Sequence, residues 1–527
     1  MPVDATFPRL LARRRAEDPG VRALVNDDAS ITYAELHDTS QARAATLVAA
    51  GVGKGDRVGL LMPNGIDWAV TACAVMRIGA ILVPLSTLLR PPELVAQLHT
   101  AAVTHLITER HYRGRSYLED LETAAPSLMD RLAQGRRHPA VPFLRHIWVA
   151  DELTTPDERA SGGSELVAAT EQCVRPADDM AIMFTSGSRG APKGVIHTHG
   201  NALRAVAASL EARGVGAGDR LYIPMPFFWM GGFAGGLLSV LLAGATLLTE
   251  SAPEPASTIA FLDRERATLF RGWPDQAARI AADPSFADAD LTSLRGASLP
   301  AVLPPALESA PGARANLFGM TESFGPYCGD RLDVDLPEDK YGSCGRPFTG
   351  IEVRVADLDH GHELAPGEEG EIQLRGPNMM RGICGRDRST VFTIDGYYPT
   401  GDLGRVDPDG YLWYSGRRDD MFKVKGATVY PSEVEAALRA VPDVAQAFVT
   451  NVADADGRDE VAALVVSPLS IDEIVAGVRA QLSAFKVPTL WLVVTDADAV
   501  PKSATGKIDV GALRNLLNAQ AATVERT

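Results

Sequence analysis

The sequence predicts a layered α/β protein followed by a smaller α+β domain. Over residues 57–106, apolar strand-like runs alternate with helical patterns, which is typical of a parallel sheet covered by helices. Residues 350–415 carry short strand patterns separated by turns, and the composition becomes charged and helical after residue 416. A chain of 527 residues is also too long for one ordinary core. We therefore expect an N-terminal domain over residues 1–416, with a β-rich subdomain at about 340–416, and a C-terminal domain over residues 417–527.

The first hundred residues carry the start and stop signals of this α/β body. Residues 22–33 predict a short strand–turn–strand, after which Thr32 suits a helix N-cap and Glu35 the capping-box position. The glycines of residues 51–55 look like a dinucleotide-binding fingerprint, but they follow a helix and precede a strand, which is the wrong order. Residues 58–62, 66–79 and 80–85 then predict a βαβ unit.

Composition and charge exclude several classes of protein. The chain is 46% apolar and 22% charged, as in a soluble globular protein, and its net charge of −16 argues against general nucleic-acid binding. The five cysteines are scattered without metal-ligand spacing, which favours a reduced protein without structural zinc. No signal peptide begins the sequence, and no apolar run reaches the roughly 18 residues of a membrane span. We expect a cytoplasmic protein with no transmembrane segment and no nucleic-acid partner.

The most informative stretch is residues 181–195, where an apolar strand runs into a glycine-rich loop. Thr185, Ser186 and Ser188 offer hydroxyl groups, Arg189 and Lys193 add positive charge, and successive loop amides can bind an anion. The loop is not a Walker A motif, because its lysine follows a proline rather than a glycine. It is either a glycine-rich turn between two strands or a loop that holds a polyphosphate.

Aromatic residues and glycines gather in residues 221–236. Phe227, Phe228 and Trp229 are followed by glycines at 231, 232, 235 and 236. Aromatic side chains beside glycines offer an apolar wall with space next to it, which suits an apolar ligand. A buried strand-to-helix junction explains the pattern equally well. The nearby His197 and His199 fit a helix start or packing better than catalysis.

The order Thr-Ser-Gly-Ser-x-Gly-x-Pro-Lys-Gly at residues 185–194 resembles the phosphate loop of the adenylate-forming superfamily. This superfamily contains acyl-CoA synthetases, adenylation domains of peptide synthetases and beetle luciferases. Most members have Thr-Thr where this chain has Ser188 and Arg189. Residues 316–322 resemble the family's Tyr-Gly-Met-Thr-Glu motif with Phe318 in place of tyrosine, and residues 416–426 resemble its hinge motif. The resemblance covers essentially the whole chain and implies a β-barrel-like subdomain and a mobile C-terminal lid.

The resemblance also implies roles for individual residues. Lys507, Thr185 and Glu322 are expected to be catalytic, with Glu322 and Thr185 also binding Mg²⁺, for which a carboxylate oxygen is a suitable ligand. Asp419 is the expected hinge, and Lys425 and Gly426 are expected at the channel for coenzyme A. The expected ATP-binding residues are Thr185, Ser186, Gly187, Ser188, Arg189, Gly190, Lys193, Gly296, Ala297, Ser298, Asn316, Leu317, Phe318, Gly319, Met320, Thr321, and, for the ribose, Asp402 and Arg417.

The expected reaction is the ATP-dependent joining of a carboxylic acid to coenzyme A by way of an acyl adenylate. Amino-acid-activating relatives place an Asp near the position of Phe228, and this chain has none there, so a bulky apolar acid (aryl, polycyclic or fatty) is expected. The predicted acid pocket consists of Phe227, Phe228, Trp229, Met230, Gly232, Phe233, Phe324, Gly325 and Pro326.

Three other functions share some or all of these motifs. A stand-alone enzyme that loads a carrier protein would keep every motif, so a carrier protein is an alternative partner, as is a second copy of the chain in a homodimer. A luciferase-like oxygenase is disfavoured because the C-terminus lacks a peroxisomal Ser-Lys-Leu tail. A catalytically inactive nucleotide sensor is disfavoured by the presence of Lys507 and Glu322.

Overall fold

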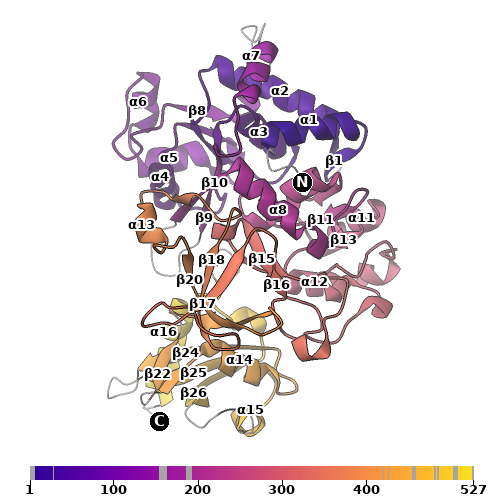
Figure 1. Cartoon of the computed structure of the whole chain (residues 1–527), viewed down its shortest axis with the longest axis vertical. Coiled ribbons are helices and arrows are strands. Elements are labelled where there is room, and N and C mark those ends of the chain that lie inside the picture. Colours follow the sequence, from indigo (N-terminus) through magenta and orange to yellow (C-terminus); the bar gives the residue numbers. More distant parts are fainter. Residues whose placement is uncertain are drawn as a thin grey trace. The chain divides into compact units, whose positions relative to one another are not determined.

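The computed structural model describes residues 6–27, 29–153, 163–185, 193–418, 421–424, 427–453, 459–479, 482, 486–502 and 508–524. The chain forms two compact units, and Figure 1 labels their elements. The N-terminal unit contains Met1–Glu352 and Leu374–Tyr398, and the C-terminal unit contains Val353–Gln373 and Pro399–Thr527. The predicted domain boundary between residues 416 and 417 stays a prediction.

The N-terminal unit contains a seven-stranded sheet that carries the predicted βαβ unit. Strands β4, β3, β5 and β8 are parallel, β9 joins β4 in parallel, and β10 and β19 complete the sheet as antiparallel strands. The order is β19 (Gly382–Ile383), β10 (Lys193–Thr198), β9 (Asp179–Thr185), β4 (Ile81–Pro84), β3 (Arg57–Leu61), β5 (His105–Thr108) and β8 (His146–Val149). The parallel α/β body expected from residues 57–106 is confirmed.

A second sheet of this unit is mostly parallel, except that β1 and β2 pair as the predicted strand–turn–strand. Its order is β13 (Leu269–Phe270), β11 (Arg220–Tyr222), β12 (Thr246–Thr249), β1 (Arg22–Asn26) and β2 (Ala29–Thr32). Two small antiparallel groups accompany it: β14 (Phe318–Met320) with β15 (Gly325–Gly329) and β16 (Arg346–Pro347), and β6 (His111–Tyr112) with β7 (Arg115–Ser116).

Helices cover these sheets, and α3 lies deepest. Every residue of α3 from Trp68 to Arg77 is buried, because its apolar residues occur on all sides of the helix. Helices α1 and α2 pack against it (Figure 1). The helices of the unit are α1 (Phe7–Glu17), α2 (Tyr33–Ala49), α3 (Ile66–Arg77), α4 (Pro91–Thr100), α5 (Tyr117–Ala124), α6 (Leu128–Ala133), α7 (Gly163–Gln172), α8 (His199–Arg213), α9 (Met230–Gly232), the π-helical η3 (Phe233–Leu238), α10 (Ser239–Ala243), α11 (Pro255–Arg264), α12 (Pro274–Ala281) and α13 (Arg388–Val391).

Two helix starts test the predicted caps. The capping box of α2 is confirmed: the Thr32 hydroxyl accepts from the backbone N–H of Glu35 at 3.2 Å, and Glu35 accepts from the backbone of Thr32 at 2.8 Å. In the sequence, Asn201 also suits the N-cap of the helix that ends at Arg213, and this expectation is wrong. Thr198 is the N-cap, and Asn201 is the third helical residue, whose side-chain oxygen accepts from the Thr198 backbone N–H at 2.6 Å. An Asn in that position completes a capping box as Glu does in α2.

The C-terminal unit is α+β. One antiparallel sheet has the order β17 (Glu352–Ala356), β18 (Gly370–Arg375), β20 (Tyr398–Val406) and β21 (Leu412–Arg417). These strands account for the β-rich segment, and closure of this sheet into a barrel stays a prediction. Its other elements are β22 (Phe422–Val424), β23 (Ala427–Val429), β24 (Gln446–Ala453), β25 (Asp459–Val466), β26 (Leu490–Val494), α14 (Pro431–Arg439), α15 (Ile471–Val478) and α16 (Val510–Val524).

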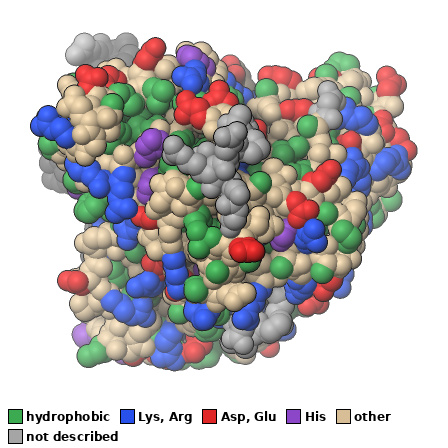
Figure 2. All heavy atoms as spheres, turned by 90° about the horizontal axis from the view of Figure 1, so that it is seen from above, with side chains coloured by type: hydrophobic (Ala, Val, Ile, Leu, Met, Phe, Trp, Pro, Cys, Tyr) green, Lys and Arg blue, Asp and Glu red, His purple; other side chains and the backbone are tan. Residues whose placement is uncertain are grey.

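The surface carries charges of both signs. On the face that Figure 2 shows, basic and acidic side chains are interspersed rather than gathered by sign. Within the described ranges, none of the helices combines the length and the apolar character that crossing a membrane requires.

Candidate active site

The two ends of the predicted phosphate loop face each other on neighbouring strands. Thr185 is the last residue of β9, Lys193 is the first of β10, and the two are cross-strand partners. Both side chains are half-buried. An antiparallel pair of strands therefore holds the entry and exit of the loop in fixed register. Ser186, Gly187, Ser188, Arg189 and Gly190 lie outside the described residues.

The predicted adenine-binding motif lies on the β14–β15 hairpin. Phe318 packs edge-on against Tyr327, with 5.5 Å between ring centroids. Gly319 is required by the hairpin, because a Cβ at this position would lie 2.3 Å from the carbonyl oxygen of Gly325. The flanking Asn316 and Gly319 are exposed, and Leu317, Met320 and Thr321 are half-buried. The motif therefore offers one held aromatic ring and exposed backbone, which suits a planar base.

Glu322 is the charged residue that the structure positions most firmly. It lies in the short 3-10 helix η7 (Thr321–Ser323), which packs against β9, the strand that ends in Thr185. Its residue is only 6% exposed, and one carboxylate oxygen accepts a hydrogen bond from the Tyr398 hydroxyl at 2.9 Å. Its backbone carbonyl accepts from the Met380 N–H at 2.8 Å. A carboxylate oriented in this way fits the role of a Mg²⁺ ligand beside the phosphate loop.

The segment expected along the adenine is held by its own polar atoms. The Arg314 guanidinium donates to the carbonyl of Gly296, and the Ser298 hydroxyl accepts from the Phe270 N–H at 3.1 Å. Ala297 is buried beside Gly214. Because the Ser298 hydroxyl is buried and already used within the protein, contact with a nucleotide here would come from the backbone.

Asp402 and Arg417 meet in the C-terminal unit, as the shared ribose role requires. They are cross-strand partners on β20 and β21, and the guanidinium donates to the carboxylate at 2.7 Å. The same guanidinium nitrogen donates to the carbonyl of Thr400 at 3.0 Å. Asp402 is 7% exposed and its carboxylate is therefore held in place before any ligand binds.

Four predicted residues of the C-terminal domain lie outside the described residues: Asp419, Lys425, Gly426 and Lys507. On either side of these undescribed residues near Lys507, Lys502 and Ile508 form an isolated antiparallel bridge. The roles of these four residues stay predictions.

The aromatic residues of the predicted acid pocket separate into two groups. Phe227 and Phe233 are 0% exposed and pack edge-on against Trp68, at centroid distances of 5.2 Å and 5.9 Å. Phe324 packs against Phe233 at 6.0 Å. These three rings belong to the main core, so they are packed core residues rather than an exposed wall for a ligand. For these three residues, the alternative of a buried strand-to-helix junction is therefore the correct one.

The second group is partly exposed, apart from Phe228. Trp229, Met230, Gly325 and Pro326 are half-buried, whereas Phe228 is buried at 6% exposed. Trp229 packs edge-on against Phe228 at 5.3 Å and against Trp273 at 5.9 Å. The four half-buried residues are the members of the predicted pocket that have surface to offer a ligand.

The interpretation of the glycines as leaving open space is wrong for Gly231, Gly232 and Gly235. A Cβ at Gly231 would lie 2.1 Å from the Met225 sulfur, and one at Gly232 would lie 2.3 Å from the carbonyl oxygen of Pro226. At Gly235 it would lie 2.9 Å from the Arg213 guanidinium. The glycines allow other parts of the protein to approach closely, because they lack side chains.

His197 and His199 are interior residues, as expected. Each is 0% exposed. The Nδ1 atom of His197 lies 2.9 Å from the Asn201 amide nitrogen, and that of His199 accepts from the Phe7 N–H at 3.2 Å. Burial lowers the pKa of each imidazole to about 3, so both are neutral at physiological pH and neither is suited to proton transfer there.

These two histidines should make the protein sensitive to acid. A histidine whose pKa is lowered on folding stabilises the protein fully above its unfolded pKa, near 6.5, and this contribution is lost as the pH falls toward about 3. For His199, lowering the pH from 7 to 5 should reduce the free energy of unfolding by about 2 kcal/mol. Urea unfolding of wild type and His199→Gln at both pH values measures this, with the exposed His99→Gln as control. An equal loss in wild type and His199→Gln would contradict the assignment.

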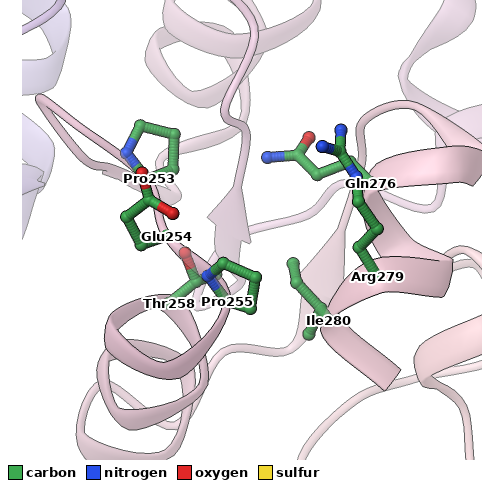
Figure 3. A pocket seen from close by; sticks show the side chains of 7 residues that line it. All are labelled: Pro253, Glu254, Pro255, Thr258, Gln276, Arg279 and Ile280. Atoms are coloured by element: carbon green, nitrogen blue, oxygen red, sulfur yellow. The ribbon is translucent and has the colours of Figure 1, made fainter. Parts of the chain in front are cut away.

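A separate polar cavity lies between the start of α11 and helix α12. It has a volume of about 160 Å³ and is lined by Pro253, Glu254, Pro255, Thr258, Gln276, Arg279 and Ile280. Figure 3 shows Glu254 on one side of it and Arg279 and Gln276 on the other. It contains none of the predicted site residues, and we assign it no part in the reaction.

Comparison with known protein families identifies the family to which the chain belongs. The family model for AMP-binding enzymes matches residues 11–384, and the model for the C-terminal domain of the same enzymes matches residues 433–507. The chain belongs to the AMP-binding enzyme family. Its two matched segments cover the loop at 185–194, Glu322 and the C-terminal lysine 507.

Relatives in this family are similar along their whole length. A 3-[(3aS,4S,7aS)-7a-methyl-1,5-dioxo-octahydro-1H-inden-4-yl]propanoyl:CoA ligase from Mycobacterium tuberculosis is 34% identical, over 97% of this chain and 99% of that protein. A feruloyl-CoA synthase from Amycolatopsis is also 34% identical, over 95% of this chain and 97% of that protein. The crystal structure of the anthranilate CoA ligase AuaEII with anthranoyl-AMP has a TM-score of 0.79 and 25% identity, covering 99% of both chains.

These findings confirm the predicted AMP-binding family, the mixed α/β fold with a large N-terminal and a small C-terminal domain, and the class of reaction. This AMP-binding enzyme is an AMP-forming acid:CoA ligase. Sequence reasoning missed Tyr398. It is the second residue of a Tyr-Tyr pair shortly before Asp402, so only the folded structure shows its contact with Glu322.

Proposed function

We propose that this AMP-binding enzyme activates a bulky, largely apolar carboxylic acid, of the aryl or polycyclic class, and transfers it to coenzyme A. The observation that carries the proposal is the placement of Glu322: a buried carboxylate, oriented by Tyr398, in a helix packed against the strand that ends in Thr185. A carboxylate in this position supports Glu322 as the metal ligand beside the loop that the sequence predicts for phosphate.

In the first step, a carboxylate oxygen of the acid attacks the α-phosphorus of ATP, and the bond from that phosphorus to the bridging oxygen of pyrophosphate breaks. The products are acyl-AMP and pyrophosphate. Both reactants are anions, so catalysis depends on positioning and on neutralising charge. Lys507 supplies a positive charge to the acid carboxylate and the α-phosphate, and Lys193 and Arg189 face the departing phosphates.

In the second step, the thiolate of coenzyme A attacks the acyl carbon, and AMP leaves with the bridging oxygen. Asp402 and Arg417 hold the ribose of the nucleotide, and Phe318 supports its base. Mg²⁺ bound by Glu322 and Thr185 would neutralise phosphate charge. Lys425 and Gly426 border the path of the pantetheine arm.

The class of acid is supported by the accessible part of the pocket and by the relatives. Trp229 and Met230 give an apolar, partly exposed wall. The named relatives act on a propanoic acid attached to a fused bicyclic ring and on ferulic acid. Both carry a ring system rather than a charged amino group, in agreement with the absence of an Asp near Phe228.

The test is pyrophosphate release with a panel of acids in the presence of ATP, Mg²⁺ and coenzyme A. Aryl-propanoic, cinnamic and fused-ring propanoic acids should be turned over at least 10-fold more efficiently than amino acids or acetate. Formation of the acyl-CoA is followed in the same reactions by chromatography. A preference for amino acids would contradict the proposed substrate class.

The alternative acceptor is a carrier protein bearing phosphopantetheine, since such an enzyme would have the same nucleotide site. Comparing coenzyme A with a phosphopantetheinylated carrier as acceptor separates the two. The relatives are named for coenzyme A, so we expect transfer to coenzyme A to be the faster reaction.

The proposed hinge at Asp419 predicts a selective loss of the second step. Asp419→Pro restricts the backbone at the point where the C-terminal domain is proposed to turn between the two steps. Thioester formation should fall about 100-fold, while adenylation changes less than 10-fold. Single-turnover assays of each step measure this, and Asp419→Ala, which keeps a flexible backbone, is the control. A larger effect on adenylation would place the hinge elsewhere.

A further inference from the structure

A positively charged side chain lies inside the N-terminal unit, next to the predicted acid pocket. Arg213 is the last residue of α8, and its Nη1 lies 2.9 Å from the place that a Cβ on Gly235 would occupy. Its Nη2 lies 3.9 Å from the corresponding place at Gly325. Gly325 belongs to the predicted pocket and Gly235 to the glycine series beside it. The guanidinium therefore lies at the pocket wall, in space that these two glycines leave.

This guanidinium has no partner among the described residues. No carboxylate of that part of the chain lies within ion-pair distance of it, and it donates no hydrogen bond there; its Nε is fully buried and unsatisfied. Burial lowers the pKa of Arg213 to about 10. Arg213 as a residue is half-buried, and its Nε is buried without a partner. A partly desolvated charge that the protein neither pairs nor hydrogen-bonds is costly, and an incoming acceptor would relieve this cost.

The Arg213 side chain is not needed to cap the C-terminus of α8, because two other arginines bind the last carbonyls of this helix. The Arg271 guanidinium donates to the carbonyl of Arg213, and the Arg295 guanidinium donates to the carbonyl of Gly214 at 2.7 Å. Cations at a helix C-terminus commonly bind these last carbonyls. Because the carbonyls of Arg213 and Gly214 already accept these hydrogen bonds, the Arg213 guanidinium has a role other than capping.

The surrounding charges leave this region positive. Burial and the nearby charge of Arg213 lower the pKa of Arg271 to about 9, and its Nε is also buried without a partner. The carboxylates that act on Arg271 are already paired: Asp219 with Arg295 at 2.7 Å and Asp333 with Arg331 at 2.7 Å. An incoming oxygen acceptor would meet an uncompensated positive charge.

We propose that Arg213 determines substrate specificity by binding an oxygen acceptor at the far end of the acid, a second carboxylate or a ring carbonyl. The inference rests on the proposed function, because it names the class of acid that this same pocket takes. Arg271 acts as a positioning residue, since it holds the end of the helix that carries Arg213. The substrate is then an acid with a largely apolar ring body that carries a polar oxygen remote from the carboxylate being activated.

The experiment compares matched acids on wild type and Arg213→Met, which keeps an unbranched side chain and removes the guanidinium and its charge. The acids are 3-phenylpropanoate, 3-(4-acetylphenyl)propanoate and 3-(4-carboxyphenyl)propanoate, with fused-ring propanoic acids with and without a ring ketone. Pyrophosphate release gives kcat/KM for each. Arg204→Met is the control, because Arg204 is on the same helix and its guanidinium donates to the Pro377 carbonyl at 2.9 Å.

Wild type should prefer the oxygen-bearing acids, and Arg213→Met should lower their kcat/KM on the order of 100-fold while leaving the plain acids within a few-fold. Arg204→Met should keep the wild-type preference. Comparing the acids that carry a ketone with the acid that carries a second carboxylate shows which acceptor Arg213 binds. A wild-type preference for the plain acids, or an unchanged preference in Arg213→Met, would overturn the role of Arg213 while leaving the proposed function intact.

Failure of every acid to release pyrophosphate would count against the proposed function instead. In that case, the role of Arg213 is tested by measuring how much the same acids, in the presence of AMP, raise the melting temperature of wild type and of Arg213→Met. Stabilisation by the oxygen-bearing acids that is lost in Arg213→Met supports the inference, and equal stabilisation of both proteins overturns it.

Discussion

Replacing Lys507 by alanine should lower the rate of acyl-adenylate formation by at least about 1,000-fold. The first step brings two anions together, and Lys507 is the residue whose proposed position places a positive charge on both. The second step does not require this charge, because the acyl carbon of the adenylate is already activated. Supplied acyl-AMP should therefore still be converted to acyl-CoA at a rate within about 5-fold of wild type. Rapid-quench measurements of the two half-reactions give both numbers.

Lys502→Ala is the matched control for this experiment. Lys502 is exposed and forms the bridge to Ile508 that closes the same loop, so its replacement tests whether the loop tolerates loss of a lysine. We expect less than a 5-fold change in either half-reaction. Equal loss of both half-reactions in Lys507→Ala would contradict the assignment of Lys507 to adenylation.

The second large effect is expected for Glu322→Gln. The substitution keeps the size of the side chain and an oxygen that can accept from Tyr398, but it removes the charge that a divalent metal ion needs. Pyrophosphate release should fall by about 100-fold, and the Mg²⁺ concentration at half-maximal rate should rise. A titration of rate against Mg²⁺ measures both.

Tyr398→Phe separates the charge of Glu322 from its orientation. It leaves the carboxylate and removes the hydroxyl that donates to it at 2.9 Å. A loss of roughly 10-fold, smaller than that of Glu322→Gln, is expected, because partners of metal ligands tune affinity rather than create it. An unchanged Mg²⁺ requirement in Glu322→Gln would show that the metal is held by other groups.

Local patterns were sufficient for much of the fold. The alternation of strands and helices after residue 57 predicts parallel pairing, and β3, β4 and β5 pair in this way. The Thr32–Glu35 capping box was equally visible, because both partners lie within one helical turn. The cap of α8 was misplaced for the same local reason: Thr198 and Asn201 can each cap a helix, and only the backbone conformation distinguishes them.

The same difference between local patterns and long-range contacts applies to the candidate site. Glu322, Asp402 and Arg417 could be identified from short motifs, since the chemistry of phosphate, metal and ribose binding selects particular side chains in a particular order. The pairing of Asp402 with Arg417 follows from the register of β20 and β21, which connects residues 15 apart. The hydrogen bond from Tyr398 to Glu322 joins residues 76 apart, and no local pattern indicates it.

The sequence by itself determined the family, the order of its motifs and the reaction, because these depend on residue type and spacing along the chain. Only the tertiary structure decided what the glycines beside the acid pocket do. Their missing side chains admit Met225, the Pro226 carbonyl and Arg213 rather than open space. The physical reason is that a gap left by glycine is filled by whichever group the fold brings near it. Here one such group is the half-buried Arg213 guanidinium, whose Nε has no partner, and on this basis we propose a substrate with a polar far end rather than a purely apolar acid.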